Sequence, residues 1–347
     1  MTLAIRLKQK ISRTGPISVA SYMEMCNTAY YAHTIPMSPA GDFITAPEIS
    51  SLFGEMIALW CLDLFHKFPN AASLNLVELG PGTGQLMADI LQTFQLLQPD
   101  LPTYVTLIEK SPKLRQCQEK SLAAFANIVW LSSLQDISLP VPTDHTTCWI
   151  YLGNEFLDAL PINQYVSQKG LWFERQIALK EDQFIFTLAS TPTSLPFPAQ
   201  QEGLIVEICP QAEACIKIIA SHLSRQKGGF LFVDYAKPTP YTDTLQAIYK
   251  KKYSSPLLYP GHSDLTAPVN FAQLKKFFKP PIEPFLCDQR DFLALMGLHI
   301  RAQQILAKAS PIYKKELIQA IKRLTGTGAP PHNMGTLFKV LGGISQC

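Results

Sequence analysis

The chain has 347 residues, of which 47% are hydrophobic and 16% are charged, and its formal net charge is +3 at pH 7. This length and composition allow a large buried core in one elaborated α/β domain or in two domains. The mildly basic balance lacks the dense Lys/Arg stripe of a nucleic-acid binder, and the basic run 250–252 is short. We therefore expect a globular protein with no nucleic-acid partner.

The eight cysteines are scattered along the chain, and no Cys/His cluster has zinc spacing. Several of them lie in apolar segments, where a free cysteine behaves as a small hydrophobic residue. No apolar run reaches the roughly 18 residues that a membrane span requires. We therefore expect a reducing compartment, no metal and no membrane span.

The first half of the chain alternates between strand and helix patterns. Helical patterns cover about residues 3–11, 18–27 and 49–65, and the motif Thr45-Ala46-Pro47-Glu48 predicts a capping box. Strands and helices then follow in the order 74–79 (strand), 85–97 (helix), 104–108 (strand), 112–125 (helix), 128–131 (strand) and 147–152 (strand). This order is typical of an α/β fold with a doubly wound, mostly parallel sheet.

The second half has a different character. Alternating aromatic and β-branched residues between 164 and 188 predict inserted antiparallel hairpins. A strand at 204–208, a helix at 210–225 and strand five at 229–234 precede a segment without clean periodicity. The chain then resumes regular patterns, with a strand at 282–287, helices at 291–309 and 312–325, and a last strand at 336–341.

These patterns predict four parts. They are an N-terminal helical region with a covering loop (1–70), the main α/β core (71–235, with hairpins at about 162–203), an insertion (236–281) and C-terminal strands and helices that complete the core (282–347). A loop as long as the insertion is usually functional or disordered.

The most informative segment is Leu76–Gly84, which reads as a buried strand running into a glycine-rich turn before a helix. Glycines permit a tight turn and close approach of a ligand, and the helix N-terminus favours an anion. A dinucleotide site would have its third glycine at position 85, where this chain has Gln85. A nucleotide-type cofactor is therefore the first hypothesis, and the glycine spacing disfavours, but leaves open, a nicotinamide enzyme.

Acidic residues flank this turn. Glu78 precedes it, and Glu109 ends the next strand. Together with Gly80, Gly82 and Gly84 they resemble the S-adenosylmethionine site of class I methyltransferases, in which the second-strand carboxylate accepts both ribose hydroxyls.

Several separated motifs resemble the MidA family of class I, Rossmann-like methyltransferases, and they span about residues 15 to 340 in order. They include GDFITAPEIS (41–50), the glycine turn, IEKSP (108–112), NEFLDALP (154–161), VDY (233–235), PGHSDLT (260–266) and MGTLFKV (334–340). Three departures, Ala29, Ala236 and Asn270, lie outside the cofactor motif; Asn270 removes a carboxylate from the insertion and puts the substrate in doubt.

The resemblance implies methyl transfer from S-adenosylmethionine. A mitochondrial member of the family, which acts in complex I assembly, modifies an arginine of a complex I subunit. The acceptor expected here is therefore an arginine of a protein, with a respiratory complex I subunit as the model target. Because the match starts near the N-terminus, we expect a bacterial, cytoplasmic protein.

The chemistry of an arginine acceptor points to carboxylates. Guanidinium stays protonated at neutral pH, and carboxylates can bind it bidentately and take up the released proton. Glu155 and Asp158 follow strand four and are the predicted catalytic pair, with Asn154 beside them as a substrate contact. Capping of the following segment is the alternative for this pair.

Four further residues are weaker candidates. Asp42 and Asp136 are predicted cofactor contacts, and His262 and Asp264 are predicted substrate contacts. Other functions also stay open: an assembly factor that binds a partner subunit and keeps a methyl-donor site for stability, or a small-molecule methyltransferase.

Overall fold

The computed structural model describes residues 1–37, 41–137, 146–199, 201–236, 242–328 and 333–345. The chain divides into two compact units. The sheet unit comprises Ile44–Phe156, Cys215–Ala236 and Phe271–Cys347, and the second unit comprises Met1–Phe43, Leu157–Ala214 and Lys237–Asn270. The predicted four-part division at residues 70, 235 and 281 stays a prediction.

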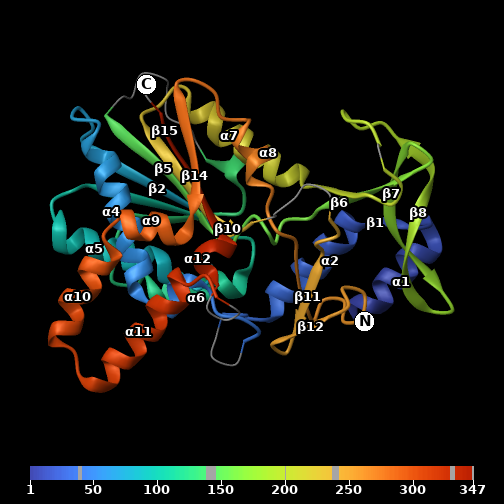
Figure 1. Cartoon of the computed structure of the whole chain (residues 1–347), viewed down its shortest axis with the longest axis horizontal. Coiled ribbons are helices and arrows are strands. Elements are labelled where there is room, and N and C mark those ends of the chain that lie inside the picture. The colour runs from blue at the N-terminus through green and yellow to red at the C-terminus, as the bar shows by residue number, and fades with distance from the viewer. Residues whose placement is uncertain (38–40, 138–145, 200, 237–241, 329–332, 346–347) are drawn as a thin grey trace. The chain divides into compact units, whose positions relative to one another are not determined.

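A seven-stranded sheet forms the centre of the sheet unit, in the order β14-β15-β10-β5-β2-β3-β4 (Figure 1). Its strands are β2 (Ser73–Leu79), β3 (Thr103–Ile108), β4 (Ile128–Leu131), β5 (Thr147–Asn154), β10 (Gly228–Tyr235), β14 (Ile282–Asp288) and β15 (Phe338–Ser345). Neighbours from β4 to β10 pair in parallel, whereas β15 is antiparallel to both β10 and β14. This mostly parallel, doubly wound sheet confirms the predicted fold class.

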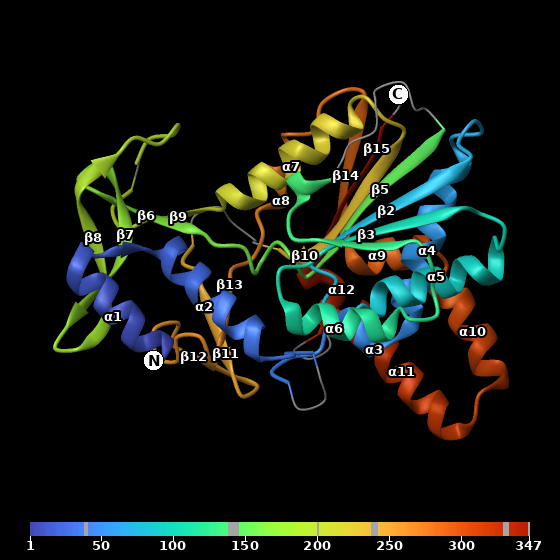
Figure 2. The ribbon, with the colours of Figure 1, turned by 180° about the vertical axis from the view of Figure 1, so that it is seen from behind.

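The order of the strands reverses at β2. From β2 the chain proceeds to β3 and β4 towards one edge of the sheet. It then returns to place β5 on the other side of β2, and Figure 2 labels β2, β3 and β5 in a view from behind. In open α/β sheets, ligands bind at such a reversal, outside the carboxyl ends of the strands. The sheet therefore fixes where a ligand site is expected.

Helices cover both faces of this sheet. Along β5, Ile150 and Leu152 face the main hydrophobic core, which includes α4 (Ser51–His66) and α5 (Gln85–Leu97). The alternate residue Tyr151 faces His222, near the end of α7 (Pro210–Leu223), and its hydroxyl lies 2.5 Å from Nδ1 of that histidine. Burial on both faces explains the continuous apolar run from which this strand was predicted.

Two elements near the C-terminus correct the sequence-based predictions. The predicted helix 291–309 is two helices, α9 (Gln289–Leu295) and α10 (Leu298–Lys308), because Gly297 adopts a left-handed conformation with φ 91°. The predicted last strand at 336–341 begins instead with the short helix α12 (Met334–Leu337), and β15 follows it. The remaining helices of the sheet unit are α3 (Ala46–Ile49), α6 (Pro112–Ser121), α8 (Phe271–Lys275) and α11 (Pro311–Thr325).

In its described residues, the second unit contains two helices and two antiparallel sheets. The helices are α1 (Leu3–Thr14) and α2 (Val19–His33), and one sheet contains β1 (Ile17–Ser18), β6 (Asn163–Gln168), β7 (Leu171–Lys180), β8 (Gln183–Thr193) and β9 (Ile205–Ile208). The pairs β6–β7 and β7–β8 lie where residue alternation predicted hairpins. A core that includes Leu7, Tyr22 and Ile177 stabilises this unit.

The insertion is more regular than its sequence indicated. It contributes a three-stranded sheet of β11 (Gln246–Tyr249), β12 (Lys252–Ser254) and β13 (Asp264–Thr266). The amide of Asn27 on α2 donates to the backbone oxygens of Leu265 (2.8 Å) and Ala159 (3.0 Å), so it links three segments within the second unit. In the described part of the chain, no helix is both long and apolar enough to cross a membrane.

Candidate active site

Three predicted site residues stand at the carboxyl ends of adjacent strands. Gly80, Glu109 and Glu155 directly follow β2, β3 and β5. Their amides continue the ladder, because Gly80 N–H donates to Ile108 O (3.1 Å), Glu109 N–H to Leu131 O (2.9 Å) and Glu155 N–H to Val233 O (2.8 Å). The sheet itself, rather than a free loop, therefore positions these residues at the strand-order reversal.

The glycine turn after β2 requires its glycines. Gly80, Gly82 and Gly84 have φ values of 64°, 54° and 85°, which residues with a Cβ rarely adopt. A Cβ on Gly80 would also lie 2.6 Å from Cδ2 of Phe156. Gly84 is the N-cap of α5, so the turn leads directly to a helix N-terminus.

Glu109 is held by the start of the next helix. Its Oε1 accepts the N–H of Ser111 at 2.7 Å, and the hydroxyl of Ser111 caps α6 by accepting the N–H of Leu114 at 3.2 Å. Burial raises the pKa of Glu109, while the Ser111 amide opposes this shift. The carboxylate thus has a fixed orientation at the carboxyl end of β3, as a contact to a vicinal diol requires.

Glu78, on β2 two residues before Gly80, is only 2% exposed. Burial raises its pKa to about 8, and repulsion from Glu48 and Glu109 adds to the shift. Its Oε2 has no hydrogen-bond partner among the described residues. An unpaired buried acceptor beside the glycine turn fits a ligand that brings its own donor or positive charge.

The raised pKa of Glu78 predicts a pH-dependent stability. An unfolded glutamic acid titrates near 4.3, so this group favours the folded state below about pH 4.5, and the contribution is lost as pH rises towards 8. Between pH 5 and 8 the unfolding free energy of the unmodified chain should fall. In Glu78→Gln we expect this fall to be smaller by more than about 1 kcal/mol. Denaturant unfolding of the ligand-free protein at several pH values measures this difference.

The exposed Glu316 on α11 provides the matched control for that experiment. Glu316→Gln should leave the slope of stability against pH unchanged. An unchanged slope in Glu78→Gln as well would contradict the assigned burial effect.

The short helix α3, which precedes α4, is hydrogen-bonded to the glycine turn. Oε1 of Glu48 accepts the hydroxyl of Thr83 at 2.6 Å, and its other oxygen accepts the hydroxyl of Thr45. The predicted capping box is therefore wrong in its bonding, because the Thr45 hydroxyl bonds to the Glu48 carboxylate and caps no backbone amide. The polar side chains instead join α3 to the turn.

Glu155 has an unusual backbone and a fixed carboxylate. Its φ is 50°, and its Oε1 accepts the N–H of Ala46 at 2.9 Å. Burial raises its pKa to about 8, with repulsion from Asp234 and Glu48 as lesser causes. Glu155, directly after β5, thus combines a strained backbone with a poorly solvated carboxyl group. This combination is a feature of functional sites.

Two neighbours hold the segment around Glu155. Asn154 Nδ2 lies 3.4 Å from Oε1 of Glu155, while its own Oδ1 is buried without a partner in the described structure. Asp234, 1% exposed at the end of β10, accepts the N–H of Phe156 at 3.1 Å. These contacts fix the segment that leaves the sheet.

The other predicted residues are divided between the two units. Asp136 is exposed at the end of a 3₁₀ helix, Leu134–Asp136, in the sheet unit. The second unit contains Asp42, Asp158, His262 and Asp264. The structure therefore brings together the glycine turn, Glu78, Glu109, Asn154 and Glu155, and the roles of the remaining candidates stay predictions.

Within the second unit, Asp264 has the most unusual environment. It is 3% exposed and accepts the hydroxyl of Tyr31 at 2.8 Å, and burial raises its pKa to about 7. Asp42 accepts the hydroxyl of Tyr30 at 2.6 Å. His262 is exposed, and the carbonyl of Asp158 accepts the N–H of Ala267 at 2.9 Å.

Sequence reasoning missed three residues that build the site. Gln118 on α6 bonds to the carbonyl of Gly82 at 2.8 Å, Glu48 bonds to Thr83, and Asp234 fixes Phe156. The acidic end of a buried strand could have indicated Asp234. Nothing in the local sequence indicated Gln118, since its neighbours come from other elements.

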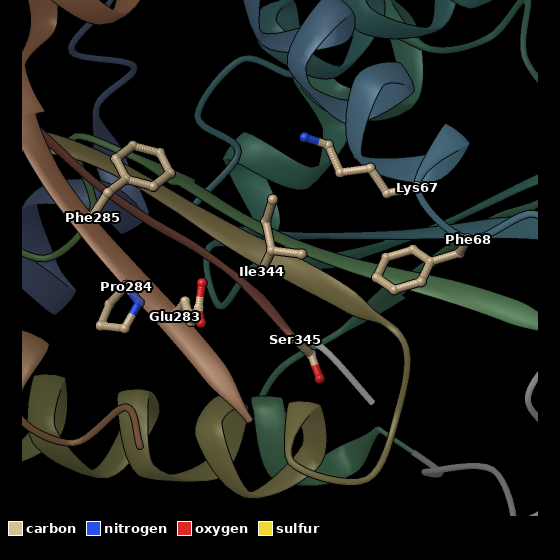
Figure 3. A pocket seen from close by; sticks show the side chains of 7 residues that line it. All are labelled: Lys67, Phe68, Glu283, Pro284, Phe285, Ile344 and Ser345. Atoms are coloured by element: carbon tan, nitrogen blue, oxygen red, sulfur yellow. The ribbon is translucent and has the colours of Figure 1, made fainter. Parts of the chain in front are cut away.

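A cavity of about 760 Å³ lies elsewhere on the sheet unit (Figure 3). Its lining includes Lys67, Glu283, Phe285 and Ser345, near the start of β14 and the end of β15. Because Ser345 pairs with Gly228 at the start of β10, this cavity lies at the amino ends of the parallel strands, opposite the glycine turn. Among the described residues, no group of three or more His, Cys, Asp or Glu could hold a metal ion.

The chain resembles proteins of known class over nearly its whole length. Residues 56–280 match the family described as "Putative S-adenosyl-L-methionine-dependent methyltransferase". Curated relatives named "Protein arginine methyltransferase NDUFAF7, mitochondrial" include one from Danio rerio, 32% identical over 96% of this chain and 84% of its own length. The relative from Homo sapiens is 30% identical over 96% of this chain and 81% of its own length.

A solved structure supports the fold. A Burkholderia thailandensis protein crystallised with S-adenosyl-homocysteine covers 99% of this chain and 91% of its own, with a TM-score of 0.77 and 24% sequence identity.

The curated relatives also correct one prediction. The expectation of a bacterial, cytoplasmic protein is wrong, because the curated relatives are named as mitochondrial proteins. That expectation depended on the position at which the motif match begins, which carries no information about the compartment.

The match over most of the chain, together with a glycine turn and acidic strand ends at the strand-order reversal, places the chain in this family: it is an S-adenosylmethionine-dependent methyltransferase.

Proposed function

We propose that the chain methylates an arginine guanidinium of a protein. The observation that carries the proposal is the half-buried carboxyl group of Glu155, fixed by the Ala46 amide at the strand end next to the glycine turn. The names of the curated relatives, which specify protein arginine methyltransferases, support the same acceptor. A subunit of respiratory complex I stays the predicted target.

In this proposal the glycine turn, Glu78 and Glu109 bind the methyl donor. Glu109 accepts the ribose hydroxyls, and the unpaired oxygen of Glu78 faces the donor's polar groups. S-adenosylmethionine supplies a methyl group on a sulfonium sulfur. Asp42 and Asp136 are proposed as further cofactor contacts.

Glu155 is proposed to bind the guanidinium and to receive its proton. The acceptor nitrogen forms the new bond to the methyl carbon while the carbon–sulfur bond breaks and its electron pair stays on sulfur. The nitrogen then carries an extra proton, which passes to the Glu155 carboxylate. A pKa raised to about 8 makes this carboxylate a stronger base than an ordinary glutamate, which suits that task.

Asp158 is proposed as the second carboxylate that orients the guanidinium. Asn154, His262 and Asp264 are proposed as further substrate contacts. Of these, Asp264 is the most deeply buried carboxylate of its unit, and its pKa, raised to about 7, would fall on contact with a cation.

Identification of the methylated amino acid tests the acceptor. The purified chain is incubated with methyl-labelled S-adenosylmethionine and a protein extract, and the labelled protein is hydrolysed and separated by chromatography. We expect label in methylarginine, and none above background with Glu155→Gln. Label in methyllysine would contradict the arginine acceptor, and label only in small molecules would contradict a protein acceptor.

A further inference from the structure

Gln118 connects the two halves of the cofactor site. This side chain of α6 is 0% exposed. Its Nε2 donates to the carbonyl of Gly82 at 2.8 Å and to Oε2 of Glu109 at 3.1 Å. One amide nitrogen therefore joins the glycine turn after β2 to the carboxylate after β3.

The orientation of this amide is determined by Trp130. The indole N–H can only donate, and Trp130 Nε1 lies 3.0 Å from Oε1 of Gln118. The amide oxygen must therefore face Trp130, and both amide hydrogens face the site. A flipped amide would place two donors against each other and an acceptor against Glu109.

The backbone of α6 also packs against the turn. A Cβ on Gly84 would lie 3.2 Å from Cα of Gln118, so the helix approaches the turn closely. Glu109 is thus held on both oxygens, by Ser111 N–H on Oε1 and by Gln118 on Oε2. Neither the turn nor the carboxylate can move without breaking a hydrogen bond to the same buried amide.

We infer that Gln118 is a positioning residue for the methyl donor, which aims the Glu109 carboxylate at the ribose hydroxyls and fixes its spacing from the glycine turn. The inference rests on the proposed role of Glu109. Gln118 itself touches protein groups and acts through Glu109. A neutral amide suits this task because it orients the carboxylate and leaves its charge available to the hydroxyl donors.

The test measures selectivity for the ribose hydroxyls. Calorimetry gives the affinity of the full chain for S-adenosylhomocysteine and for its 2′,3′-dideoxyribose analogue. For Gln118→Leu we expect about 10- to 100-fold weaker binding of S-adenosylhomocysteine. The analogue should lose much less affinity, so the ratio of the two affinities falls towards one.

The matched control is Gln116→Leu, because Gln116 is an exposed glutamine on the same helix. It should leave both affinities unchanged. Equal weakening of both ligands by Gln118→Leu would show a general structural role and overturn the inference, as would no weakening at all.

A second variant keeps the inference testable if Gln118→Leu does not fold. Trp130→Phe retains an aromatic ring on β4 but removes the donor that orients Gln118. It should lower the affinity ratio in the same direction, by about threefold or more, and an unchanged ratio would overturn the inference. Failure of the unmodified chain to bind S-adenosylhomocysteine would instead contradict the proposed cofactor site.

Discussion

Glu109→Ala should weaken binding of S-adenosylhomocysteine by at least about 100-fold. The carboxylate at the end of β3 is fixed by Ser111 and Gln118, and in the proposed site it accepts two ribose hydroxyls. Hydrogen bonds to a charged group contribute about 1.5–3 kcal/mol each, so loss of two corresponds to this change in affinity. Isothermal titration calorimetry with the full-length chain measures it directly.

The control for that experiment is Glu119→Ala on α6. Glu119 is exposed and pairs with Arg115 at 3.5 Å, so its removal should leave ligand affinity unchanged. A folded Glu109→Ala protein with the affinity of the unmodified chain would refute the assignment of Glu109. Thermal unfolding without ligand verifies that the variant folds.

Glu155→Gln should have the largest effect on catalysis. The amide keeps an oxygen that can accept the N–H of Ala46, so the local structure should persist. It cannot carry a negative charge or take up a proton, and we expect methyl transfer to fall by about 10²- to 10⁴-fold. Single-turnover transfer to protein, measured with saturating methyl donor, isolates this step.

Two further observations distinguish a catalytic role of Glu155 from a structural one. Affinity for S-adenosylhomocysteine should stay within about threefold of the unmodified chain, since the proposed donor contacts are made by other residues. The rate of the unmodified chain should rise with pH up to about 8, as Glu155 loses its proton, and Glu155→Gln should lack this rise. Transfer at near the original rate would disprove the role.

The fold could be predicted to a large extent because its signals are local. The strands of the parallel part of the sheet, the glycine turn and the helix start at Pro112 each occupy a few consecutive residues, and the structure has them close to where they were predicted. The predicted helix 291–309 was wrong because one left-handed glycine, Gly297, interrupts an otherwise continuous helical pattern. The insertion was harder, since its short strands have too few residues to show a period.

The site could be predicted less completely than the fold. Gly80 and Glu109 could be predicted from the sequence because each stands directly after a recognisable strand. Gln118 and Glu48 could not be identified in this way, because their roles arise from hydrogen bonds to Gly82, 36 residues away, and to Thr83, 35 residues away. Such pairs are visible only when the helices are packed on the sheet.

The extension of the strand ladder into Gly80, Glu109 and Glu155 has an energetic consequence. A ligand that binds at loops must order them first, and this conformational entropy reduces its affinity. Here the backbone that carries these three residues belongs to the hydrogen-bonded ladder of the sheet, so it is ordered by the sheet itself. In the proposed site, the free energy of each contact can therefore contribute to holding the methyl donor and acceptor in line, and such alignment accelerates a displacement reaction.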